Sequence, residues 1–148
     1  MRDGITSNQV KRALSPASVA DTTAQVGQII DHQGYDSASY LIATGSIADA
    51  DATFTVLLEE GDVANLSDAA AVADDDMVSQ TSGTAPETAA AFDFADDNQV
   101  RKLGYVGSKR YTRLTITPVA NASAAVMSAV CVLNERSTGT AVAAQATA

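Results

Sequence analysis

The chain has one histidine and one cysteine, and these two residues are the first to consider for catalysis. His32 is the only imidazole base, so a Ser-His-Asp arrangement would have to combine it with Asp31 or Asp36. No nucleophile-elbow pattern accompanies it, and its place in a glycine-containing turn indicates a surface histidine. Cys131 lies in an apolar run without a nearby histidine, which indicates a small buried residue rather than a reactive thiol. One Cys and one His also exclude a zinc site built from these residue types.

The acidic residues are the next candidates, because paired carboxylates cleave sugars and clustered carboxylates bind calcium. Asp and Glu make up 18 of the 148 residues, so some of them lie close together in any fold and proximity alone indicates nothing. The absence of tryptophan leaves little for a sugar-stacking platform. Asp74-Asp75-Asp76 and Asp49-Ala50-Asp51 offer oxygen ligands without the EF-hand spacing. We interpret both as solvated acidic loops, with calcium binding as the alternative.

The glycine-containing stretch at residues 104–109 ends in a lysine but lacks the phosphate-loop spacing, and we interpret it as a hairpin turn. Residues 109–113 interleave basic side chains with an aromatic one, as nucleic-acid-binding surfaces do. In a chain of net charge −9, however, three basic residues give a weak positive potential. This pattern favours contact with an acidic protein surface, on the same chain or on another protein.

The charges are distributed unevenly along the chain. No Lys or Arg lies between Arg12 and Arg101, whereas most of the acidic residues lie in this interval. Such an acidic surface repels nucleic acid and anionic membranes, so we expect neither as a partner; plain solubility is the alternative explanation of the charge. The few basic residues are expected to include protein–protein contacts. The candidate interface residues are Lys11, Arg12, Arg101, Lys102, Lys109, Arg110, Tyr111 and Arg113.

The elements that must position these residues are predicted to be strands. Apolar and polar residues alternate clearly in residues 53–59 and 110–117, and Pro118 is expected to end the second of these strands. Residues 124–133 are apolar at nearly every position, which predicts a central strand buried on both faces. A short helix is expected at most near residues 68–73. The remaining strands are expected at residues 25–30, 37–44, 88–94 and 99–106.

Short strands at this spacing predict an all-β domain, either an antiparallel β-sandwich or a jelly-roll-like barrel, over residues 24–134. Residues 1–23 contain few large apolar side chains around Pro16, which predicts an extended N-terminal arm that packs onto a neighbouring molecule. Residues 135–148 are mostly small and polar, which predicts a flexible C-terminal tail. No secretory signal or membrane-spanning stretch is recognisable, so we expect synthesis in a cytoplasm.

A family resemblance is carried by residues 104–118, Gly-Tyr-Val-Gly-Ser-Lys-Arg-Tyr-Thr-Arg-Leu-Thr-Ile-Thr-Pro, followed by an apolar strand ending at Val132-Leu133. Together with Gly34-Tyr35-Asp36-Ser37-Ala38 and with Leu57-Leu58-Glu59-Glu60 before an acidic loop, this pattern resembles small virion proteins of tailed bacteriophages. The resemblance covers residues 25–133. The chain departs from the family after residue 133, where an Ala/Thr tail replaces a short basic, proline-containing ending. The resemblance implies a head-associated protein that decorates or cements a capsid and has no catalytic residues.

We therefore expect a non-enzymatic structural protein of the virion, made in the cytoplasm of a host bacterium and located on the capsid surface. Its expected partner is the major capsid protein, and no cofactor or metal is expected. A homotrimer at the threefold positions of a capsid lattice would combine several weak contacts into firm attachment. The alternatives are a tail or head-to-tail completion protein and, from a different class, an enzyme or a receptor- or glycan-binding module.

Overall fold

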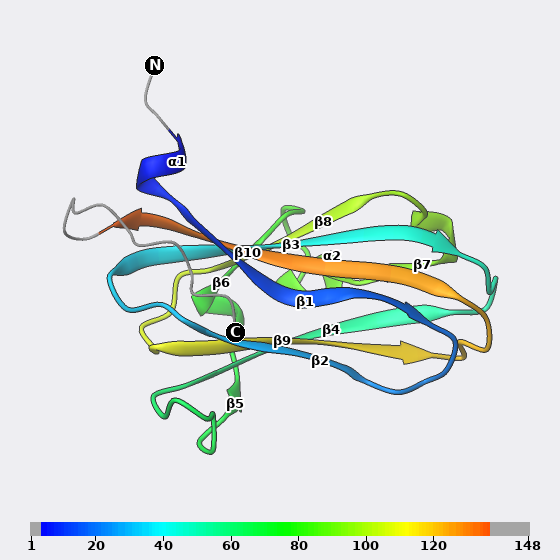
Figure 1. Cartoon of the computed structure of the whole chain (residues 1–148), viewed down its shortest axis with the longest axis horizontal. Coiled ribbons are helices and arrows are strands. Elements are labelled where there is room, and N and C mark those ends of the chain that lie inside the picture. The colour runs from blue at the N-terminus through cyan, green and yellow to red at the C-terminus, as the bar shows by residue number, and fades with distance from the viewer. Residues whose placement is uncertain (1–3, 137–148) are drawn as a thin grey trace.

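Two antiparallel sheets pack against each other (Figure 1). The computed structural model describes residues 4–136. Sheet A has the strand order β1-β10-β3-β8-β6, with bounds Gln9–Val19, Ala125–Arg136, Tyr35–Ile47, Val100–Tyr105 and Met77–Ser79. Sheet B has the order β2-β9-β4-β5, with bounds Gln25–Asp31, Tyr111–Val119, Thr53–Gly61 and Ala70–Ala71, and β7 (Phe92–Asp93) also pairs with β4. The all-β sandwich expected from the sequence is confirmed.

The core lies between the sheets because each strand turns alternate side chains inward. From sheet B, Phe54, Val56 and Leu58 of β4 meet the interior beside Leu114 and Ile116 of β9, as the alternation in the sequence predicted. Sheet A contributes Tyr40, Ile42, Leu103, Met127 and Leu133 to the same cluster. The alternating side chains on the other side of each strand form the outer faces of the two sheets.

The helices are short. They are α1 (Gly4–Ser7), which lies above the end of β10 in Figure 1, α2 (Pro86–Ala90), and the 3-10 turns η1 (Asp74–Asp76) and η2 (Phe94–Asp96). The helix expected near residues 68–73 is absent. The carboxylate of Asp68 instead accepts hydrogen bonds from the backbone N–H groups of Asp62 and Val63, at 2.7 and 3.2 Å, and so closes a loop. Residues 88–94, expected to be a strand, are divided between α2, β7 and the start of η2.

Residues 9–19, expected to belong to an N-terminal arm, form strand β1, which pairs antiparallel with β10 along its length. Leu14 and Val19 are buried in the core of their own chain. The register shifts between Arg12 and Leu14 and again between Leu14 and Ala17, so the sequence shows no regular alternation there. The arm prediction is therefore wrong for residues 9–19.

Two other expectations need correction. Strand β9 runs through Pro118 to Val119, because β2 pairs with β9 only as far as Ile116, and a proline beyond that point removes no hydrogen bond on this side. Strand β10 is central in sheet A, but only one of its faces is buried, with Val126 and Val130 exposed on the other. The backbone of β10 continues to Arg136, and the tail predicted over residues 135–148 otherwise lies outside the described residues.

Candidate docking face

The outer face of sheet A carries no carboxylate among its described strand residues. Alternation with the buried residues of the five strands places seventeen residues on this face. They are Val10, Arg12 and Ser18 of β1; Val126, Ser128, Val130, Val132 and Asn134 of β10; Ser37, Ser39, Leu41, Ala43 and Gly45 of β3; Val100, Lys102 and Gly104 of β8; and Val78 of β6. In a chain with 18 acidic residues, such a face is the exception.

Arg12 and Lys102 are the only charged residues among these members, and the strand register puts them in one row across four strands. Arg12 is opposite Val130, Val130 is opposite Leu41, and Leu41 is opposite Lys102. Because neighbouring strands are about 4.8 Å apart, the two backbones are separated by roughly 14 Å. The row is thus an apolar centre with one cation at each end.

A hollow of about 280 Å³ indents this face where β8 meets β6. Its lining includes Ser39, Val78, Lys102, Gly104 and Val106. A Cβ atom at Gly104 would lie 2.8 Å from the Cβ atom of Val78, so the close approach of β6 requires glycine at this position. Val78 and Val106 are 52% and 49% exposed. The hollow therefore offers two exposed valines among neutral polar side chains, with the ammonium group of Lys102 as its one charged group.

The outer face of sheet B differs in character. Thr53, Thr55 and Thr117 line it together with four exposed apolar residues, and its cation is already neutralised. The apolar residues are Val26, Ile29, Leu57 and Val119. The guanidinium of Arg113 donates to Glu59 Oε2 from Nε and Nη2, at 3.1 and 2.9 Å. The two outer faces thus both expose apolar side chains, and they differ in charge: the cation of sheet B is paired with Glu59, whereas no described strand residue on the outer face of sheet A carries a carboxylate.

Most of the predicted interface residues make contacts within their own chain. Arg101 pairs with Asp96, Lys109 with Asp62, Arg110 with Asp31, and Arg113 with Glu59. The hydrogen bond from Arg110 is also the main cause that lowers the pKa of Asp31. These pairs correspond to the in-chain alternative that the sequence left open, and all but Arg101–Asp96 join residues far apart in sequence. Their role in contacts between subunits stays a prediction.

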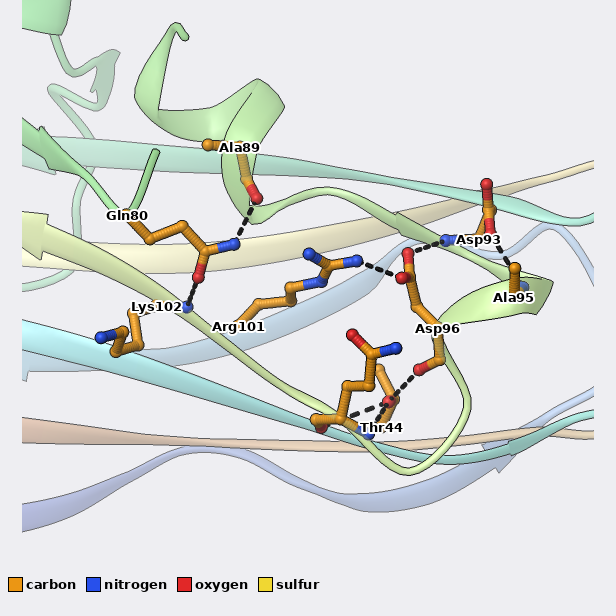
Figure 2. Close-up of polar contacts among 9 residues, drawn as sticks. Thr44, Gln80, Ala89, Asp93, Ala95, Asp96, Arg101 and Lys102 are labelled. Carbon is orange, nitrogen blue, oxygen red and sulfur yellow. Dashed lines mark hydrogen bonds and ion pairs between the residues drawn. The ribbon is translucent and has the colours of Figure 1, made fainter. Parts of the chain in front are cut away.

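The other four predicted residues divide into two pairs. Lys11 donates from Nζ to the backbone oxygen of Asp31 at 3.1 Å, and the Tyr111 ring lies 5.0 Å from the guanidinium of Arg110. Arg12 and Lys102 form no ion pair with another described residue. Figure 2 shows Arg101 reaching Asp96 while the side chain of Lys102, the next residue of β8, extends in another direction. The structure thus places both Arg12 and Lys102 on the outer face of sheet A, at opposite ends of the row.

An exposed aromatic residue, Phe94, is a second feature that the sequence did not reveal. Phe92 and Phe94 were expected on one face of a strand, but only Phe92 is buried, where it stacks on Phe54 with ring centroids 4.7 Å apart. The chain turns into η2 after Asp93, and Phe94 is 46% exposed. It is the only aromatic residue among the exposed large hydrophobic side chains of the described part of the chain. Asp93 and Asp97, both exposed, flank this tip.

His32 was expected at the surface, but it is only 7% exposed. Its Nε2 atom lies 2.5 Å from Oγ1 of Thr112, which also lies 2.5 Å from the hydroxyl oxygen of Tyr40. Burial lowers the pKa of His32 to about 4. Thr112 is fully buried, so these contacts satisfy polar groups inside the sandwich. His32 also lines a surface hollow of about 350 Å³, together with Tyr105 and Lys109.

The described residues include no group of three or more His, Cys, Asp or Glu side chains arranged to hold a metal ion. No described helix is long and apolar enough to span a membrane. Cys131 is buried, as the sequence predicted, and burial raises the pKa of its thiol to about 12. Comparison of the chain with protein-family models and with curated proteins gives no match.

Proposed function

We propose that this chain is a structural protein of a tailed-bacteriophage particle, which decorates and stabilises the capsid by binding neighbouring proteins through the outer face of sheet A. The observation that carries the proposal is the composition of that face. Eight of its seventeen members are Val, Leu or Ala, its described strands carry no carboxylate on this side, and its two cations form no ion pair with a described residue.

Strand β10 supports a partner on this face. Its sequence is apolar in both alternating registers, as in strands that are covered on both sides. Within one chain the inward register is covered by sheet B, while Val126 and Val130 of the outward register remain exposed. Exposed apolar surface that extends over several strands is typical of protein-binding sites. A covering protein would give β10 the environment for which its composition is suited.

The charges indicate the nature of this partner. Arg12 and Lys102 frame the apolar row and would be matched by carboxylates on an opposing protein surface. The rest of the chain is strongly acidic, which disfavours binding of packaged nucleic acid and of anionic membranes. The combination supports a protein partner such as the major capsid protein.

The resemblance of residues 104–118 to small virion proteins of tailed bacteriophages supports the same role. These residues form the last two positions of β8, the following turn and most of β9, which are parts of the sandwich. A role in holding other proteins together requires a stable domain with binding surfaces and no catalytic group. We propose accordingly that the protein acts without catalysis, is made in the host cytoplasm, and is located on the capsid surface.

Cryo-electron microscopy of the intact particle, compared with a particle made without this protein, tests the proposal. We expect difference density repeated over the capsid lattice, with the outer face of sheet A turned towards a neighbouring protein. Density confined to one vertex or to the tail would instead support a tail or head-to-tail completion protein. Absence of difference density from the particle would contradict a structural role in the virion.

A further inference from the structure

We propose that the outer face of sheet A binds a second copy of this chain, whose Phe94 seats in the hollow beside Lys102. The inference deepens the proposed function, because it names one occupant of the binding face. The hollow lies towards the β6 edge of sheet A, so the β1–β10 half of the face remains available for the capsid protein.

Shape and polarity match between the tip at Phe94 and the hollow. Phe94 lies in a turn and is exposed, whereas Phe92 is buried in the core and stacks on Phe54. The lining of the hollow includes Val78 and Val106, and Gly104 leaves its floor without a side chain. Interfaces commonly centre on an aromatic side chain that fills a pocket of this kind. Seating Phe94 there would cover one exposed aromatic and two exposed valines together.

Charge complementarity supports the same pairing. Asp93 and Asp97 flank Phe94, and Lys102 lies at the edge of the hollow. The carboxylate of Asp93 accepts from the N–H of Ala95, and that of Asp97 accepts from the N–H of Ile47, so both are held in place on the exposed tip (Figure 2 shows the first). In this pairing the carboxylates that flank Phe94 would lie close to the ammonium group of Lys102 on the other copy.

The geometry requires two molecules. The tip precedes the start of β8 at Val100, whereas Gly104 lies four residues further along the strand, which corresponds to roughly 13 Å. A chain therefore cannot place its own Phe94 in its own hollow. A symmetric pair in which two outer faces meet would bring Lys102 and Arg12 of both copies together without carboxylates, which is unfavourable. Tip-to-hollow contact joins two different surfaces, so a closed assembly is either a two-fold dimer in which each copy seats the other's tip or a ring of three or more copies.

Sedimentation velocity and light scattering of the purified chain over a range of concentrations test this inference. The wild-type chain is expected to form a closed oligomer, and two variants are expected to prevent it. Phe94→Ser removes the tip, and Val78→Asp places a carboxylate in the hollow opposite the acidic tip. Val26→Ser, which changes an exposed valine on β2 of sheet B, serves as the matched control and should assemble as the wild type does.

A mixture of the two variants gives the sharper result. The Phe94→Ser chain keeps its hollow and the Val78→Asp chain keeps its tip, so an equimolar mixture is expected to form 1:1 dimers although each variant alone is monomeric. Circular dichroism and thermal unfolding of each variant establish that it is folded before mixing. A fully symmetric face-to-face interface would not be restored in this way.

A monomeric wild-type chain at millimolar concentration, an oligomer unaffected by either variant, or a mixture that stays monomeric would each overturn the inference. None of these outcomes would affect the proposed function if the chain still occupies the capsid lattice. Conversely, tip-to-hollow assembly of a protein that is absent from particles would support the inference and contradict the proposed function.

Discussion

His32, Thr112 and Tyr40 form a polar chain between the two sheets, and its balance depends on the protonation of His32. Oγ1 of Thr112 lies 2.5 Å from both His32 Nε2 and the Tyr40 hydroxyl oxygen, so neutral imidazole is part of a satisfied network. The ring also lies against Tyr105, with centroids 5.1 Å apart. Burial, and then the positive charge of Lys11, lower the pKa of His32 from 6.5 to about 4. The fold therefore favours the neutral form of His32, and protonation of its imidazole destabilises the folded chain.

This arrangement predicts a loss of stability in mild acid. Between pH 6.5 and about pH 4 the unfolded chain binds a proton at His32 and the folded chain does not, so the free energy of unfolding falls as pH falls. The contribution of His32 to this loss is expected to reach at most about 3 kcal/mol. Urea unfolding of the wild type and of His32→Gln, measured from pH 7.5 to pH 4, isolates it from the titration of carboxylates. Equal pH dependence in the two proteins would contradict the assignment.

At the scale of elements, the short edge strand β6 is extended by a side chain. β6 ends at Ser79, and beyond it the amide of Gln80 takes the place of a strand (Figure 2). Its Oε1 accepts from the backbone N–H of Lys102 and its Nε2 donates to the backbone oxygen of Ala89, each at 2.7 Å. This contact occupies a backbone group of β8 that would otherwise be open to strand addition by another chain.

Replacing Gln80 is expected to expose this edge. In Gln80→Ala the Lys102 N–H loses its acceptor, and the free energy of unfolding should fall by about 1 kcal/mol. Native-state hydrogen exchange followed by NMR should show faster exchange of the Lys102 amide. Gln80→Glu is the matched control, because its carboxylate still accepts from Lys102 but cannot donate to Ala89. If Lys102 exchanges equally fast in Gln80→Glu and Gln80→Ala, the amide of Lys102 is not protected by this contact.

The elements also show how far the sequence predicts the structure. Strands β4 and β9 follow from regular alternation of apolar and polar residues, because each has a partner strand on both sides and one buried face. Strand β1 could not be recognised, since two register shifts disturb its alternation and its partner β10 is more than 100 residues away. The apolar pattern of β10 was interpreted as burial on both faces, but Val126 and Val130 are exposed on its outer side, which we propose is covered by a partner.

The candidate site was only partly predictable for the same reason. Sequence position identified the basic residues, but the partners of Arg110 and Arg113 lie 79 and 54 residues away, so in-chain pairing could not be recognised. The row that joins Arg12 to Lys102 depends on the order of four strands. The exposure of Phe94 depends on where β7 ends and η2 begins. All of these features depend on how distant strands pair and where they end, which a local sequence pattern does not predict.

At the scale of the whole molecule, the charges are separated by face. The net charge of −9 is carried by loops and by the residues around the sandwich, while the outer face of sheet A has only cations among its described strand residues. We propose that the outer face of sheet A provides the contact when a complementary protein surface is present. The account as a whole depends on this face being the one that holds the protein in the particle.

Binding of purified protein to particles that lack it tests this claim most directly. Val130→Asp places a carboxylate at the centre of the apolar row, and Thr55→Asp places the same carboxylate on the outer face of sheet B. We expect Val130→Asp to weaken binding by at least about tenfold, since a buried unpaired charge at an interface is costly, and Thr55→Asp to bind as the wild type does. Full occupancy by folded Val130→Asp, or an equal loss with Thr55→Asp, would contradict the account.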